Sequence, residues 1–352
     1  MNVARMRVAS QHIARPVFDD PAAVVQWFGA VQAQDYLGGL WALGLRTRGA
    51  TEASVERAID AGRFVRTWPM RGTLHFVAAA DVRWMLSLLT PRVAGAVSAR
   101  WRQLGLDNAV MARSAKLAEK ALVGGKRLRR EAMYKVWNDA GIATHESRGL
   151  HILAHLAQSG LLCFGPRDGK QHTFTLVEEW LPSARLLERD IALGEIARRY
   201  FTSHGPATVH DLAWWSGLTV TDARAGLDSV KSELESETIG TRTLWFAATS
   251  APSATKAVFL LPTWDEYTVA YRDRSDILDP RYAIRVNAGG GILKPVVVVR
   301  GQVVGTWQRT IGKGGVVVRP APFARLDRAQ AKALEVAARK YGRFLGVPAT
   351  VG

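Results

Sequence analysis

Arg63-Phe64-Val65-Arg66-Thr67-Trp68 alternates polar and apolar residues, is interrupted at Pro69, and resumes as Arg71-Gly72-Thr73-Leu74-His75-Phe76-Val77. A period of two residues is typical of β-strands, so we predict a β-hairpin over this stretch. Predicted helices over residues 22–34 and 51–60 precede it. Helix, helix and hairpin in this order are typical of a winged helix.

The same order of elements occurs twice more along the chain. Predicted helices cover 82–89, 91–104, 109–123, 128–140 and 147–158, and strands follow around 161–164 and 171–176. Further helices cover about 184–203, 206–217 and 219–230, followed by strands around 237–239 and 242–246. Small residues at Ala213, Gly217 and Ala223 suit the close packing and the left-handed turn of a helix-turn-helix. An ordinary αα-hairpin is the alternative for this short motif.

The last hundred residues have a different character. Residues 251–320 are rich in β-branched residues and glycine, which predicts a small barrel or a strongly bent sheet. A terminal helix follows over 327–345. We therefore predict an α+β protein of three tandem winged-helix domains, a small β-rich, barrel-like C-terminal domain and a terminal helix. The predicted domains are residues 1–105, 106–182, 183–250 and 251–352.

The charge balance indicates a polyanionic partner. The chain has 47 Lys and Arg against 31 Asp and Glu, a net charge of +16. Arginine carries most of the excess, and its guanidinium binds phosphate through two parallel hydrogen bonds. Nucleic acid is therefore the expected partner. A soluble protein that happens to be basic is the alternative.

Several classes of protein are disfavoured. Cys163 is the single cysteine, so no disulfide can form within the chain, and no apolar stretch is long enough to span a bilayer. With no leader visible, we expect a cytoplasmic protein that associates with the nucleoid through DNA. No nucleotide-binding glycine loop is present. His151 and His155 form half of a zinc site at most, so no metal or other cofactor is expected.

The candidate chemistry lies in Val31-Gln32-Ala33-Gln34-Asp35, where two amides flank a small residue. Asp265 and Glu266 stand between two aromatic residues, and a turn with a salt-bridged carboxylate is the plainer interpretation there. The candidate phosphate contacts are Arg63, Arg66, Arg71 and Lys313. The alternative is a solvated strand face for the three arginines and an ordinary tight turn for Lys313.

Three segments carry a resemblance to a known family. They are Arg66-Thr67-Trp68-Pro69-Met70-Arg71-Gly72-Thr73-Leu74-His75, Leu260-Leu261-Pro262-Thr263-Trp264-Asp265-Glu266-Tyr267 and Gly305-Thr306-Trp307-Gln308-Arg309-Thr310. Together with Gln32-Ala33-Gln34 and the tandem winged helices, they make the chain resemble the bacterial winged-helix DNA glycosylase superfamily typified by AlkZ and YcaQ. The Gln-x-Gln motif places it on the AlkZ-like branch.

The resemblance implies a monofunctional DNA glycosylase that acts on alkylated purines in double-stranded DNA, and some members of the family unhook interstrand crosslinks. It implies catalytic roles for Gln32 and Gln34 and a monomeric state. Asp35, His75, Asp265 and Glu266 are candidate supporting residues. An amide can position a water molecule but is a poor general base, so the motif predicts restriction to cationic lesions such as N7-alkylpurines.

A second hypothesis is a winged-helix regulator or architectural protein without catalysis. It predicts salt-sensitive DNA binding with selectivity for a sequence rather than for a lesion.

Overall fold

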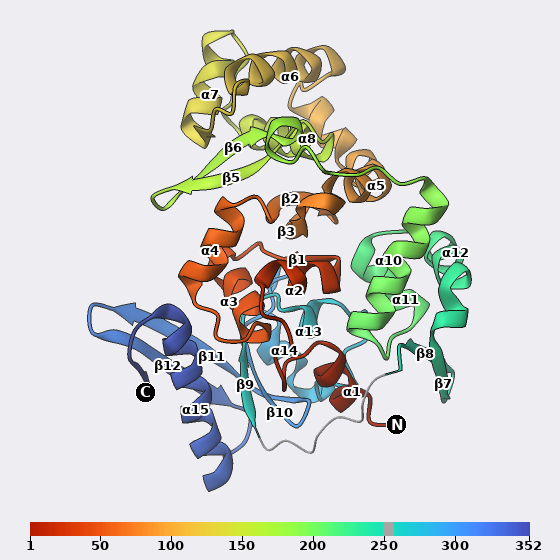
Figure 1. The fold of residues 1–352 in the computed structure, drawn as a ribbon, viewed down its shortest axis with the longest axis vertical. Helices are drawn as coiled ribbons and strands as arrows, with labels where there is room; N and C mark the ends of the chain where they lie inside the picture. Colours follow the sequence, from red (N-terminus) through yellow and green to blue (C-terminus); the bar gives the residue numbers. More distant parts are fainter. Residues whose placement is uncertain (249–256) are drawn as a thin grey trace. The chain divides into compact units, whose positions relative to one another are not determined.

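The structure is a computed structural model that describes residues 1–248 and 257–352. Contacts along the chain divide it into two units (Figure 1). Unit 1 comprises Met1–Glu56, Leu193–Trp215 and Thr219–Gly352, and unit 2 comprises Arg57–Ala192 and Ser216–Leu218. The predicted domain boundary between residues 250 and 251 lies outside the described residues. The mixture of helices and strands confirms the α+β class.

Unit 1 combines helices with a five-stranded sheet. All or most of the following helices belong to it: α1 (Val3–Ser10), α2 (Pro21–Phe28), α3 (Tyr36–Arg46), α10 (Arg189–His204), α11 (Val209–Ser216), α12 (Val220–Val230), α13 (Glu266–Val269), α14 (Ala283–Val286) and α15 (Arg328–Leu345). Its strands are β1 (Ala30–Gln32), β7 (Glu235–Ile239), β8 (Arg242–Phe246), β9 (Val258–Leu261), β10 (Val296–Val299), β11 (Gln302–Gly312), β12 (Gly315–Pro322) and β13 (Ala349–Val351).

The five-stranded sheet has the order β13-β12-β11-β10-β9. Its neighbours are antiparallel except for β12 and β13, which are parallel. Helix α15 packs on this sheet (Figure 1). The side chain of Asp327 caps α15 together with Gln330, and Gly346 ends the helix in the left-handed conformation. The side chains of Leu334, Ala338 and Tyr341 on one face of α15 are buried, whereas Ala331 is exposed.

Unit 2 is built around two hairpins and the helices that flank them. Helix α4 (Glu52–Asp60) begins in unit 1 and ends in unit 2. The other helices of unit 2 are α5 (Val82–Gln103), α6 (Asn108–Leu122), α7 (Arg130–Asp139), α8 (Arg148–Gln158) and α9 (Val177–Trp180). Its strands are β2 (Phe64–Met70), β3 (Thr73–Ala78), β4 (Leu128–Arg129), β5 (Leu162–Asp168) and β6 (Gln171–Leu176). Large apolar residues such as Trp68, Trp137 and Phe174 form its core.

The predicted hairpins are present. Strands β2 and β3 pair antiparallel from Phe64 with Ala78 to Thr67 with His75, and β5 and β6 pair likewise. Strand β2 continues through Pro69, where the pairing shifts register instead of ending. A proline lacks the N–H that a strand ladder needs, so an irregularity at this position is the expected accommodation.

The helix predicted over residues 22–34 is wrong in its second half. Helix α2 ends at Phe28, and Ala30–Gln32 form the strand β1. Gly29 causes the change of direction, because its φ of 80° is a conformation that residues with a Cβ rarely adopt. The candidate Gln32 therefore belongs to a strand and not to a helix.

Other helix boundaries also differ from the prediction: α10 begins at Arg189 and α11 at Val209, later than expected. The helices expected at 82–89 and 91–104 are the single helix α5, which contains Pro91. A proline inside a helix removes one hydrogen bond and its ring crowds the preceding turn, yet α5 continues through Pro91. Leu128 and Arg129 form the short strand β4 beside β6, so the next helix begins later than expected.

Candidate active site

Gln32 and Gln34 lie where β1 leads into α3. Gln32 ends the strand and has only 6% of its surface exposed. Gln34 is exposed and Asp35, the residue before the first turn of α3, is half-buried. The pair therefore combines one amide that is embedded in unit 1 with one that solvent or substrate can reach.

Glu266 holds the main chain at Gln32. The backbone N–H of Gln32 donates to Oε1 of Glu266 at 2.7 Å. The other carboxylate oxygen, Oε2, accepts from Nε1 of Trp215 at 2.8 Å and contacts Nε2 of His204 at 3.3 Å. Glu266 itself is 1% exposed. A buried carboxylate is stable in this setting because N–H donors reach both of its oxygens.

His204 acts as a donor in its neutral form. Burial is the larger influence and lowers the pKa of His204, although the neighbouring Glu266 works in the opposite direction. The contact between the two side chains is therefore a hydrogen bond from a neutral imidazole rather than an ion pair at neutral pH. The rings of Tyr200 and Phe28 pack against the imidazole.

Asp265 and Arg46 form a buried ion pair next to Glu266. Both oxygens of Asp265 accept from the guanidinium of Arg46, at 2.8 and 2.9 Å. Each of the two residues is 1% exposed. Arg46 also donates to the carbonyl oxygens of Gln11 and Ala42 and to the side chain of Gln11. Helix α3 begins directly after residues 32–35, which we call the glutamine segment. The bonds of Arg46 therefore fix α3 to the segment that carries Glu266.

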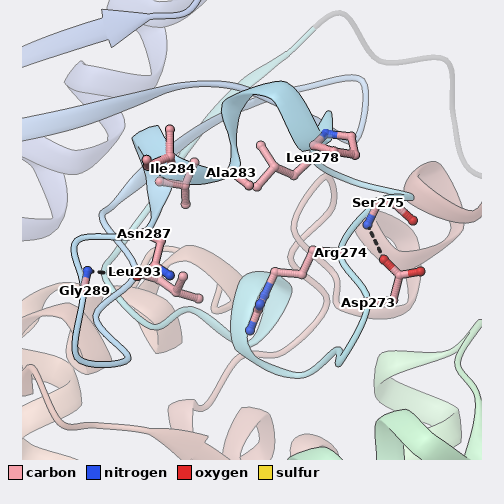
Figure 2. Close-up of a pocket in the computed structure, with 11 residues that line it drawn as sticks. Asp273, Arg274, Ser275, Leu278, Ala283, Ile284, Asn287, Gly289 and Leu293 are labelled. Atoms are coloured by element: carbon pink, nitrogen blue, oxygen red, sulfur yellow. Dashed lines mark hydrogen bonds between the residues drawn. The ribbon is translucent and has the colours of Figure 1, made fainter.

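Asp35 borders a small pocket of unit 1. Its volume is about 280 Å³. The residues that line it are Asp35, Pro262, Thr263, Pro295, Trp307, Gln308 and Arg309. A larger pocket of about 580 Å³ lies between residues 273–280 and the segment from Ala283 to Leu293 (Figure 2). Its lining, within the described part of the chain, includes no residue predicted for the site.

The predicted site residues of unit 2 gather at its first hairpin. Arg63 is exposed. Arg66 is 7% exposed, and its guanidinium lies 3.1 Å from Nε2 of His172 and over the ring of Phe164. Burial, followed by the charges of nearby arginines including Arg66, lowers the pKa of His172 to about 4.

Arg71 and His75 contact each other across the same hairpin. Nη2 of Arg71 lies 3.2 Å from Nε2 of His75, and Nδ1 of His75 lies 3.0 Å from the carbonyl oxygen of Thr73. Because the guanidinium is the donor, the Nδ1 atom of the neutral imidazole carries the hydrogen. His75 is fully buried, so its surroundings are those of a structural side chain.

Lys313 lies at the exposed tip of the hairpin formed by β11 and β12. The last paired residues are Gly312 and Gly315, which leaves Lys313 and Gly314 in the turn. The turn therefore lies between glycines. The side chain of Lys313 is exposed to solvent, so a large partner can reach it.

The sequence prediction did not include His204, Trp215 and Arg46. These residues come from three separate segments, and no short motif links them. The only available signal was the charge of Arg46 at the end of the apolar run Leu40–Leu45, because a charge beside buried residues needs a partner.

The other candidate sites gain no support. Cys163 is buried, and burial raises the pKa of its thiol to about 12, so it is not a nucleophile at neutral pH. In residues 1–248 and 257–352, no three His, Cys, Asp or Glu side chains gather as metal ligands would. Across the same residues, no helix has the length and apolar character required to cross a bilayer.

The sequence and the fold of this chain match a family of base-excising enzymes. The sequence profile of the family described as DNA glycosylase AlkZ-like matches residues 25–344, so the chain belongs to that family. It is a monofunctional DNA glycosylase, an enzyme that hydrolyses the bond between a base and its sugar.

Two matches, both to AlkZ of Streptomyces sahachiroi, agree with this assignment. One is an interstrand DNA cross-link repair glycosylase that is 27% identical over 334 residues, which are 90% of this chain and 88% of the relative. The other is the solved structure of the DNA glycosylase AlkZ, with 25% identity and a TM-score of 0.82. That comparison covers 100% of this chain and 98% of the solved one.

Proposed function

We propose that this glycosylase removes cationic N7-alkylpurines from double-stranded DNA, with Gln32 and Gln34 positioning the attacking water. The observation that carries the proposal is the Gln-x-Gln segment itself, in which Gln34 is exposed beside a firmly held Gln32. Two amide carbonyls on one short segment can accept both hydrogens of one water molecule.

The reaction needs no strong base. The glycosidic bond breaks, and its electron pair goes to the purine nitrogen and neutralises the cationic base. The sugar becomes an oxocarbenium-like cation, to which the water oxygen bonds at C1′ while its proton passes to solvent. Amides that hold the water and present their carbonyl dipoles to the cation supply position and electrostatic stabilisation. Neutral, unmodified bases are poor leaving groups and should remain in the DNA.

Interstrand crosslinks are a second substrate class in this proposal. A crosslink through N7 of guanine has the same cationic leaving group as a monoadduct, so the same chemistry unhooks it. The name of the Streptomyces sahachiroi relative, an interstrand DNA cross-link repair glycosylase, supports this extension. Because a crosslinked base cannot rotate freely out of the duplex, approach from a groove suits this substrate better than a deep pocket.

The proposal also includes a domain organisation. It consists of three winged-helix domains over residues 1–105, 106–182 and 183–250, followed by a barrel-like domain over 251–352. The repeated order of helices and hairpins supports them: α3, α4, β2 and β3; α7, α8, β5 and β6; α11, α12, β7 and β8. Gly217, between α11 and α12, has the positive φ of 78° that the turn of a helix-turn-helix requires.

The charge distribution supports a DNA-binding surface. Unit 2 carries 21 Lys or Arg against 12 Asp or Glu in 139 residues, whereas the rest of the chain carries 26 against 19 in 213. Exposed Arg63 and Lys313 and the half-buried Arg71 are the proposed phosphate contacts. Arg66, which is held by His172, is a weaker candidate because it must leave that contact to reach a phosphate. We propose that the protein binds DNA as a monomer.

Base release from alkylated DNA tests the proposal. We expect the purified protein to release N7-methylguanine from a methylated duplex and to leave unmodified and deaminated bases in place. The double variant Gln32→Ala, Gln34→Ala should bind the duplex normally but release the base at least about 100-fold more slowly. An unchanged rate in this variant refutes the assigned roles. Protection of one DNA sequence without release from any alkylated duplex favours a non-catalytic regulator instead.

A further inference from the structure

We propose that Glu266 is a positioning residue of the reaction, which acts by fixing the main chain of Gln32. This inference rests on the proposed roles of Gln32 and Gln34 and adds the group that orients them. Glu266 does not touch the substrate in this arrangement. It works through the hydrogen bond from the backbone N–H of Gln32 to its Oε1 atom, which is 2.7 Å long.

The bond to Glu266 acts on the end of the short strand β1. Gln32 is its last residue, and Gly29, with its positive φ, lies directly before the strand. The chain then turns at Ala33 and Gln34 before α3 begins at Tyr36. In a strand of three residues, each hydrogen bond to the backbone has a large share in holding the side chains in place. The bond to Glu266 fixes the peptide group from which the Gln32 side chain projects.

Glu266 is itself held in one orientation. Trp215 donates its indole N–H to Oε2 at 2.8 Å, and His204 contacts the same oxygen at 3.3 Å. Asp265, the preceding residue, is clamped by Arg46 through two hydrogen bonds. The donors approach Glu266 from α10, α11 and β1, and the carboxylate is 1% exposed. Its position is therefore set by the core of unit 1 and transmitted to the glutamine segment.

The donor pattern requires a carboxylate. A glutamine at this position would present one carbonyl oxygen and one NH₂ group. The imidazole of His204 can change tautomer, but the indole of Trp215 and the peptide of Gln32 can only donate. In either orientation the amide NH₂ of Glu266→Gln would therefore face an N–H group. The variant keeps the shape of the side chain and loses one of the two fixed hydrogen bonds.

The main test separates positioning from stability with two variants. Glu266→Gln should slow single-turnover base release about 10- to 100-fold at saturating enzyme, the effect of losing one charge-assisted hydrogen bond. The Kd for the alkylated duplex should stay within about twofold, because no DNA contact is removed. Thr90→Val is the matched control. It removes a buried hydroxyl of unit 2 that bonds to the carbonyl oxygens of Leu86 and Gln158, and it leaves Glu266 and its donors unchanged. Its release rate should equal that of the parent protein.

A second readout does not depend on activity. Hydrogen exchange of the Gln32 backbone amide should be slow in the parent protein and in Thr90→Val. It should be at least about 10-fold faster in Glu266→Gln, while amides in α15 remain protected. If Glu266→Gln does not fold, Trp215→Phe replaces it: loss of the indole donor should slow base release several-fold and speed the exchange at Gln32.

The outcomes are distinct. Equal release rates and equal Gln32 protection in the parent and in the Glu266 variant overturn this inference and leave the proposed function intact. An equal loss of rate in Thr90→Val also overturns it, because general destabilisation would then explain the effect. A parent protein that releases no alkylated base refutes the proposed function instead, and the amide exchange at Gln32 still decides whether Glu266 fixes that residue.

Discussion

The partners of the buried polar side chains in unit 1 are difficult to predict from the residue types alone. Asp265 and Glu266 are neighbours in the sequence, yet their environments differ. Asp265 is paired with Arg46, whereas Glu266 accepts from Gln32, Trp215 and His204. The sequence prediction of a salt-bridged turn is confirmed for Asp265. For Glu266 the partners are N–H groups of a strand and two aromatic side chains.

Histidines that are neutral in the fold predict a loss of stability in acid. Burial and then Arg46 lower the pKa of His12 to about 4, and the pKa of His172 is also about 4. An unfolded histidine titrates near 6.5. Between these values the unfolded chain binds more protons, so the free energy of unfolding falls as the pH decreases from about 6.5 toward 4. We expect a lower Tm at pH 5 than at pH 7.5.

The variant His172→Gln is the control for this effect. Its amide oxygen can still accept from Arg66, but it takes up no proton when the chain unfolds. The decrease in Tm between pH 7.5 and pH 5 should therefore be smaller than in the parent protein. Most carboxylates titrate below this interval, so histidines dominate the difference. A parent Tm that rises in acid, or an identical decrease in the variant, would contradict the prediction.

Helix packing shows why some glycines stand inside helices. In unit 1, α3 and α15 pack through aromatic side chains: Trp41 lies 5.0 Å from Tyr341 and 5.1 Å from Phe344, measured between ring centres. Gly44 lies under the ring of Phe344, and a Cβ at this position would overlap ring atoms. In unit 2, Gly95 stands in α5 with open space around it. The two residues look alike in the sequence and differ only in what packs on them.

Alanine substitutions at these glycines should have opposite effects. Gly44→Ala forces the ring of Phe344 aside, which costs about 1–3 kcal/mol and exceeds the gain in helix propensity. Gly95→Ala meets no atom and gains about 0.5–1 kcal/mol, because alanine loses less conformational freedom than glycine. Thermal and denaturant unfolding of the two variants measures both changes. A stabilised Gly44→Ala protein would show that α3 and α15 do not pack as described.

The uneven charge of the whole molecule is the property most directly linked to DNA. Counterion release makes binding weaker with salt in proportion to the number of phosphates contacted. Unit 2 holds the larger excess of positive charge for its size, and the hairpin tip at Lys313 adds an exposed lysine in unit 1. Substitution of one phosphate-contacting residue should therefore change the salt dependence of binding and leave the chemical step unchanged.

Lys313→Ala tests this at the hairpin tip. If Lys313 contacts a phosphate, the slope of log K against log salt should decrease in magnitude by about 0.9, and the single-turnover rate at saturating enzyme should stay the same. Lys135→Ala removes the same charge from an exposed lysine that is already paired with Asp139. It should leave the slope unchanged. Equal slopes for Lys313→Ala and the parent protein would remove Lys313 from the proposed contacts.

Local patterns accounted for most of the secondary structure. Hairpins at 63–78 and 162–176 and the terminal helix follow from period and capping residues. The exceptions are places where one residue changes the local geometry. Gly29 ends α2 early and places Gln32 in a strand, and Pro91 stays inside α5 although it usually ends a helix. An isolated glycine or proline within a helical pattern is compatible with either outcome, so the local pattern does not decide where the helix ends.

The sequence by itself determined the order of the elements, the excess of positive charge and the Gln-x-Gln motif with its family resemblance. Each of these depends on residues that are close in the chain or on the composition as a whole. The tertiary structure alone decided what holds the motif. Gln32 and Glu266 are separated by 234 positions, and His204 and Trp215 join them from two further helices. A carboxylate can be buried only where folding brings N–H donors to both of its oxygens, and that requirement is met in space and not along the chain.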